Sequence, residues 1–155
     1  MKRRNQKGLT LVELIVAFTI LFLLTTMAVP LARVKVRHEK ERELRYCLRE
    51  IRAAIDKYKD YADQNLLGPQ KQGGDNYPEN LEVLVEGVKL ATQGNDKKIR
   101  FLRRLPKDPF TNSTDWGKRS TQDDPKSTSW GGQNVFDVYS KTTEKAPDGT
   151  PYAEW

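Results

Sequence analysis

A single carboxylate stands in a long apolar run near the N-terminus, and its position demands a chemical partner. Residues 9–32 form a stretch of 24 residues that carries one charged side chain, Glu13. On insertion scales a carboxylate costs roughly 2.5–3.5 kcal/mol at the centre of a membrane helix, and less near an interface. A simple anchor would carry leucine at this position. We therefore expect Glu13 to bind a partner, and that partner to point to the function.

Other residues that commonly perform chemistry are scarce in this chain. Cys47 is the only cysteine and His38 the only histidine. An intramolecular disulfide is therefore excluded, and Cys47 is expected to be a small buried residue on a helix face. His38 lies in a charged segment and is expected to be solvated. A zinc site or a Ser-His-Asp arrangement therefore has almost nothing to be built from.

The charge balance argues against nucleic acid as a partner. The chain has 155 residues, enough for one small domain beside the apolar run. Its formal charge of +6 comes from 27 basic and 21 acidic residues. Four of the basic residues and one acidic residue precede residue 33, so residues 33–155 carry a net charge of only +3. A nearly balanced domain of this kind does not indicate nucleic-acid binding.

One continuous helix is predicted from residue 9 to about residue 63. The run 9–32 is long enough to cross a bilayer core, and residues 33–63 contain neither glycine nor proline. Such a helix would be roughly 80 Å long. Pro30 removes a backbone donor and is expected to kink or loosen it. In the second half, apolar residues recur in steps of four and three, which is typical of a helix with one buried face: Leu44, Leu48, Ile51, Ile55, Tyr58 and Ala62.

Short elements are predicted after this helix. Gly68-Pro69 and Gly73-Gly74 break the pattern, and Tyr77-Pro78 begins a short helix. Because fewer than 100 residues remain, their core must include the apolar stripe of the long helix. The expected fold is α+β, with a long N-terminal helix packed on a small C-terminal antiparallel sheet. Its further parts are an ordered turn at 105–110, the indole anchors Trp116 and Trp130, a strand at 134–140 and a polar loop at 141–151.

The segment KGLTLVEL, residues 7–14, resembles the class III leader of type IV pilins and pseudopilins. The resemblance implies that a prepilin peptidase cuts between Gly8 and Leu9 and methylates the new amine of Leu9. Glu13 is then the fifth residue after the cut, where the family places its glutamate. Pro30 falls where the family has a helix-loosening proline. Leu9 replaces the phenylalanine that is more usual there.

The later segments are similar to the major pseudopilin of type II secretion. They share the helix after a Tyr-Pro pair, the turn LPKDPF, the strand FDVYS and the terminal tryptophan. The resemblance implies a structural subunit, and not an enzyme, of a periplasmic pseudopilus that polymerises from the inner membrane to drive protein export. Its implied partners are further copies of itself, other pseudopilins, the prepilin peptidase, the inner-membrane secretion platform and a cytoplasmic ATPase.

The resemblance also divides the chain. Residues 1–8 are a leader that is removed, 9–32 a transmembrane and filament-core helix, 33–63 its amphipathic continuation, and 64–155 a periplasmic α+β head. The basic leader favours a cytoplasmic N-terminus. Residues 33–49 nevertheless carry seven basic residues against three acidic ones, so charge alone does not decide the orientation. The pilin-like leader does decide it, because its peptidase works at the cytoplasmic face of the bacterial inner membrane.

Major pseudopilins carry a calcium loop near the C-terminus, and the matching segment here is 140–155. Its candidate ligands are Asp148 and Glu154, with Glu144 nearby, but Lys141 and Lys145 lie in the same loop. Calcium takes six to eight oxygen ligands, several of them carboxylates, and this loop is short of them. The alternative interpretation is a plain turn at Asp148-Gly149.

Leu9 and Glu13 are four residues apart, so on a helix they lie on the same face, about 6 Å from each other. The resemblance implies that a neighbouring subunit, shifted along the filament, offers its Leu9 amine to Glu13. Alternatively, Glu13 pairs with its own amine or faces headgroup water.

Three other classes of protein stay open. The first is a type IV pilus subunit for adhesion or motility, a class that commonly has a C-terminal disulfide loop. The others are a bitopic membrane anchor with a soluble binding domain and a secreted protein with an ordinary signal peptide.

Overall fold

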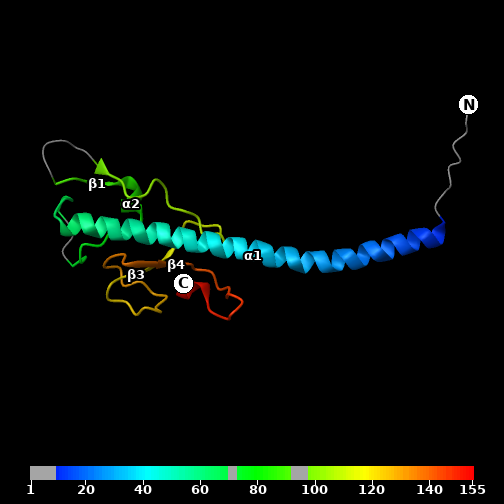
Figure 1. The fold of residues 1–155 in the computed structure, drawn as a ribbon. Helices are drawn as coiled ribbons and strands as arrows, with labels where there is room; N and C mark the ends of the chain where they lie inside the picture. Colours follow the sequence, from blue (N-terminus) through cyan, green and yellow to red (C-terminus); the bar gives the residue numbers. More distant parts are fainter. Residues whose placement is uncertain (1–9, 70–72, 92–97) are drawn as a thin grey trace, which may run out of the picture. The chain divides into compact units, whose positions relative to one another are not determined.

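The computed structural model describes residues 10–69, 73–91 and 98–155, with backbone alone at 27–31. The leader and the Gly8-Leu9 junction lie outside the described residues. The predicted continuous helix is confirmed as α1, Leu11–Asp63, 53 residues long (Figure 1). Residue 30 lies within α1, but its side chain is outside the described part, so the loosening at Pro30 stays a prediction.

The helix ends at Asp63, where the prediction put its end and five residues before Gly68-Pro69. Asn65 adopts a positive φ of 54°, a conformation that asparagine tolerates and that commonly ends helices. Its N–H donates to the carbonyl of Ala62 at 2.9 Å, and the N–H of Leu66 donates to Tyr61 at 3.0 Å. These bonds occupy carbonyls that the helix end would otherwise leave without a donor.

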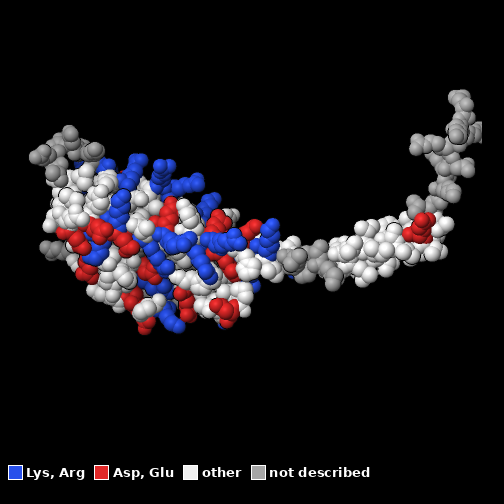
Figure 2. Space-filling view, in the orientation of Figure 1, with Lys and Arg blue, Asp and Glu red and all other residues white. Residues whose placement is uncertain are grey.

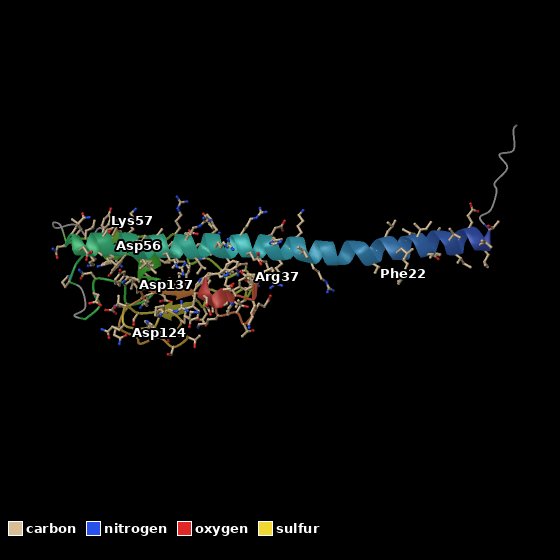
Figure 3. All side chains as sticks on the ribbon, turned by 60° about the horizontal axis from the view of Figure 1, so that its bottom comes forward. Phe22, Arg37, Asp56, Lys57, Asp124 and Asp137 are labelled. Carbon is tan, nitrogen blue, oxygen red and sulfur yellow. The ribbon has the colours of Figure 1, made fainter. Side chains whose placement is uncertain are left out.

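The chain divides into two units, residues 1–39 and 40–155. In the first, the side chains at 10–26 are exposed all round: Phe22, labelled in Figure 3, is 73% exposed. In Figure 2 the part of α1 before its grey residues is white apart from one acidic patch near its N-terminal end, and Glu13 is the only acidic residue at 10–26. Within the described residues, no helix combines the length and the hydropathy that a membrane crossing needs.

The second unit, the head, builds its core on α1, as the apolar stripe predicts. All six stripe residues are buried, with Leu44, Ile51 and Ile55 fully inaccessible. Of the two predicted indole anchors, Trp116 is buried and donates its Nε1–H to the carbonyl of Pro106, whereas Trp130 stays 37% exposed. Further members of the core come from the short elements around the helix: Leu84, Val135, Val138 and Tyr152.

These elements are short, and they form two separate antiparallel pairs rather than one sheet. The short helix α2, Glu82–Glu86, begins four residues after Tyr77-Pro78, where the Asn80 side chain accepts the N–H of Val83. Strand β1 pairs with β2, and β3 pairs with β4. Their bounds are Val88–Lys89 for β1, Lys98–Ile99 for β2, Gly117–Arg119 for β3 and Asp137–Tyr139 for β4, and a 3-10 helix η1, Tyr152–Glu154, ends the chain.

The strand predicted at 134–140 is present as β4 but starts later. The N–H of Val135 donates to the carbonyl of Pro78 at 2.8 Å instead of entering the β3–β4 ladder. In that ladder Gly117 lies opposite Tyr139, and the Tyr139 ring fills the space that a Cβ at 117 would need. A side chain at position 117 would therefore displace this ring.

Candidate functional site

The first described turn of α1 forms a helix cap around Glu13. The Oγ1 of Thr10 accepts the N–H of Glu13 at 3.3 Å, and its carbonyl accepts the N–H of Leu14 at 3.1 Å. Thr10 and Glu13 have the Thr-x-x-Glu spacing of a capping box, and an acid in the first turn is favoured by the helix dipole. The sequence carries this signal, and it is a role for Glu13 beyond those predicted.

The Glu13 carboxylate is nevertheless exposed and has no partner among the described residues. The other polar side chains of this segment are satisfied within the helix. The hydroxyls of Thr19, Thr25 and Thr26 each donate to the carbonyl four residues earlier, at 2.7–2.8 Å. Across residues 10–26, Glu13 is therefore the one side chain whose charge the described chain leaves uncompensated.

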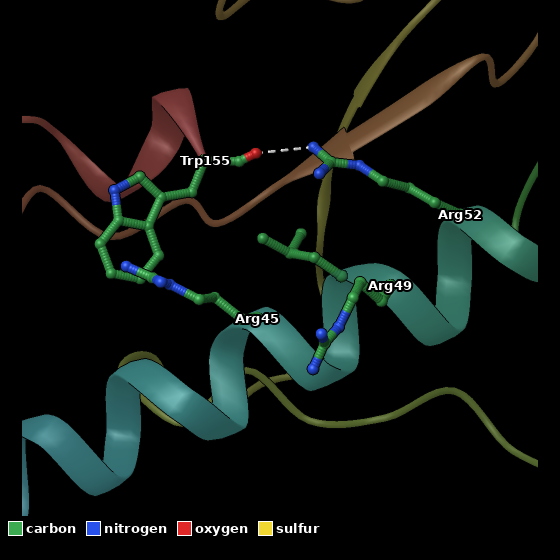
Figure 4. A pocket seen from close by; sticks show the side chains of 5 residues that line it. Arg45, Arg49, Arg52 and Trp155 are labelled. Atoms are coloured by element: carbon green, nitrogen blue, oxygen red, sulfur yellow. Dashed lines mark hydrogen bonds between the residues drawn. The ribbon is translucent and has the colours of Figure 1, made fainter.

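At the other end of the chain, two arginines converge on Asp137 and hold the C-terminus. The Nε of Arg52 lies 2.7 Å from Oδ1 of Asp137, and Nη1 of Arg119 lies 3.5 Å from Oδ2. Arg52 also donates to the carbonyl of Trp155 at 2.8 Å (Figure 4), and Arg119 donates to the carbonyl of Ala153 at 3.0 Å. We name Arg52, Arg119 and Asp137 the C-terminal clamp, because they tie α1, β3 and β4 to Ala153 and Trp155.

Tyr152 adds a second tie between η1 and α1. Its ring is fully buried and stacks on Phe110 with ring centroids 4.3 Å apart. Its hydroxyl donates to Oε1 of Glu41 at 2.8 Å. The guanidinium of Arg45 lies over the Trp155 ring, 4.2 Å from its centroid. The terminal tryptophan is thus part of the head, and the clamp and Glu41 are contacts that sequence reasoning missed.

The residues predicted for calcium, Asp148 and Glu154, each bind another group of the chain. Oδ1 of Asp148 accepts the N–H of Thr150 at 2.9 Å, which lowers the pKa of this carboxyl, and Gly149 follows with φ 89°. This is the predicted turn. Glu154 instead pairs with Lys126 at 3.1 Å. Within the described residues, no three His, Cys, Asp or Glu side chains gather in a way that could hold a metal ion. The calcium site stays a prediction from the resemblance, and we derive no role from it.

Cys47 is buried, as predicted, and its thiol faces the carbonyl of Lys107 at 3.7 Å. Burial, followed by the charges of Glu43, Glu50 and Asp108, raises the pKa of this thiol to about 11. At pH 8 roughly one thiol in a thousand is then ionised, and the thiolate is the reactive form.

We expect native protein at pH 8 to react with iodoacetamide at least about a hundredfold more slowly than protein unfolded in guanidinium. The measurement is adduct mass against time. Equal rates in the two states would show that Cys47 is not enclosed.

The fold and the N-terminal turn together define a class. An N-terminal helix that is apolar in its first part and carries the head core in its second, with a lone acid in its first turn, is the architecture of type IV pilin-like proteins. Residues 3–29 match the prokaryotic N-terminal methylation motif, in agreement with the predicted leader. No solved structure matches the chain.

The match to a curated protein gives the family. The chain is 34% identical over 113 residues to the type II secretion system core protein G of Pseudomonas aeruginosa, a match that covers 72% of this chain and 73% of that protein. The chain belongs to the family of type II secretion core protein G, the major pseudopilins, which confirms the resemblance inferred from its sequence.

Proposed function

We propose that the mature chain is the repeating subunit of a periplasmic pseudopilus, which grows from the bacterial inner membrane and drives protein export by type II secretion. Membership of the core protein G family and the methylation motif at residues 3–29 support this role. The observation that carries the mechanism is the free carboxylate of Glu13 on an otherwise apolar, internally satisfied helix segment. The work is done by polymerisation, and the chain needs no catalytic centre for it.

Processing prepares the subunit for assembly. A prepilin peptidase removes residues 1–8 and methylates the amine of Leu9, which discards four basic side chains. The new amine then lies at the positive end of the helix, where a carboxylate is favoured. Because Thr10 binds the backbone N–H of Glu13 and not its side chain, the carboxylate stays available for the amine of a neighbouring copy.

The apolar segments would form the interior of the filament. Large side chains such as Leu11 (74% exposed) and Phe22 (73% exposed) stand in solvent in the isolated chain, and a helix that is apolar all round is stable only when it is enclosed. Small residues permit close approach of neighbouring helices, and the threonines serve this purpose because their hydroxyls are already bonded to the backbone. Ala17 adds another small side chain to the same segment.

Before assembly the subunit would be anchored in the inner membrane. We place residues 9–32 in the bilayer in a single pass, 33–63 as the continuation of the helix, and 64–155 in the periplasm, where they complete the head. Pro30 would let the helix loosen as it leaves the lipid. Other pseudopilins and the inner-membrane secretion platform complete the set of partners, and the heads present the surfaces that meet them.

Polymer formation in cells tests this function. The full chain is expressed with its prepilin peptidase and secretion platform, the cells are lysed gently, polymer is sedimented from the lysate, and the pellet is probed for this chain. We expect filaments built of this subunit, and secretion that depends on it. A chain that stays monomeric in the membrane while secretion proceeds would point instead to a bitopic anchor.

A further inference from the structure

Within the head, α1 carries two flanks of opposite charge. A helix turns by about 100° per residue, and this rotation places the two flanks on either side of the buried stripe. Figure 2 looks onto Lys and Arg side chains gathered along this part of α1. The basic flank consists of Arg45, Arg49 and Arg52, and the acidic flank consists of Glu43, Tyr46 and Glu50.

The basic flank borders a groove of about 340 Å³ (Figure 4), with Leu48 in its floor and Trp155 in its wall. Two of its three arginines are engaged within the head. Arg45 lies on the Trp155 ring, and Arg52 belongs to the clamp. Arg49 is exposed and bonds to no described residue. The groove therefore offers an uncompensated cation above an apolar floor.

The two carboxylates of the acidic flank, like Arg49, have no ion-pair partner among the described residues. Glu43 and Glu50 are exposed, and neither forms an ion pair with a described residue, although Arg103, Arg104 and Lys107 line the far wall of the groove of about 690 Å³ beside them. The Tyr46 ring between them is 61% exposed. This flank presents a carboxylate, an aromatic ring and a second carboxylate in a row, which complements a groove that has a free guanidinium and an apolar floor.

We propose that in the polymer the acidic flank of one copy docks in the Arg49 groove of the next, with Glu43 on Arg49 and Tyr46 over Leu48 and Trp155. This inference rests on the proposed function. The two flanks are different surfaces of one chain, so their contact is heterologous, the type of contact that builds an open filament when its rotation does not close into a ring.

Charge reversal tests the pairing in full-length protein assembled in cells. The variants are Arg49→Glu, Glu43→Arg and the two together, with Lys98→Glu on β2 as a matched control for net charge. We expect each single reversal to lower sedimented polymer about tenfold, because close interfacial charge pairs are strongly coupled. The double variant should recover sedimented polymer to within about twofold of the unchanged chain. The Lys98→Glu control should form as much polymer as the unchanged chain. Melting of each purified variant confirms folding, since Arg49 makes no contact that its loss would break.

Two results would overturn the pairing: a single reversal that polymerises like the unchanged chain, or a double variant no better than the single ones. If Arg49→Glu abolished export while polymer stayed intact, the groove would serve another protein and the pairing between copies would be wrong. Absence of polymer from the unchanged chain would contradict the proposed function itself, which keeps the two failures apart.

Discussion

Cells that carry Glu13→Leu should process the chain normally and assemble almost none of it. The substitution suits the apolar segment and adds no cost to membrane insertion. It leaves the Leu9 amine of a neighbouring copy buried without its carboxylate, at a cost of about 3–5 kcal/mol per contact. We expect at least about a hundredfold less sedimented polymer, with export falling in parallel. The readouts are leader removal by intact mass and polymer by sedimentation.

Two companion variants separate the charge of Glu13 from its place in the capping box. Glu13→Gln keeps the capping capacity of the residue but removes the charge, and it should fail like the leucine variant. Thr10→Ala removes the hydroxyl that caps the Glu13 N–H, costs the helix about 1 kcal/mol, and should still polymerise. Normal polymer from Glu13→Gln would mean that a hydrogen bond, and not an ion pair, joins the copies.

The second large effect is expected from Asp137→Ala, which removes the centre of the C-terminal clamp. Arg119 is 5% exposed, so its charge would be left buried beside Arg52. We expect the head to lose about 2–4 kcal/mol of unfolding free energy, measured by guanidinium denaturation followed by tryptophan fluorescence. Asp115→Ala is the matched control, because Asp115 pairs with Lys141 at the surface and should cost less than about 1 kcal/mol.

A loss from Asp137→Ala no larger than that from Asp115→Ala would show that the clamp contributes little to the head. Limited proteolysis gives a second measure. Because Arg119 binds the carbonyl of Ala153 and Arg52 binds that of Trp155, the variant should release the C-terminal residues to carboxypeptidase before the rest of the head unfolds.

The long helix and the buried stripe were predictable because their signals are local. Leu44 and Ile55 belong to a pattern that repeats every three or four residues, and this spacing by itself indicates a helix with one buried face. The lone acid of the apolar run needed no structure to be noticed. The turn at Asp148 was also within reach, because Asp and Gly at adjacent positions carry their own turn chemistry.

The clamp was beyond sequence reasoning because its partners are distant in the chain. Arg52 and Asp137 are 85 residues apart, and Glu41 and Tyr152 are 111 apart. Among 27 basic and 21 acidic residues, nothing local marks which arginine meets which aspartate. The split into two strand pairs was missed for a similar reason, since strand partners are set by tertiary packing and the strands here are only two or three residues long.

The intact mass of the chain, purified from the membranes of cells with an active prepilin peptidase, tests the central claim most directly. If Glu13 pairs with the Leu9 amine that processing creates on another copy, the measured chain begins at Leu9, lacks the mass of residues 1–8, and carries one added methyl group. A chain that retains residues 1–8 under these conditions would offer no such amine and would contradict the account.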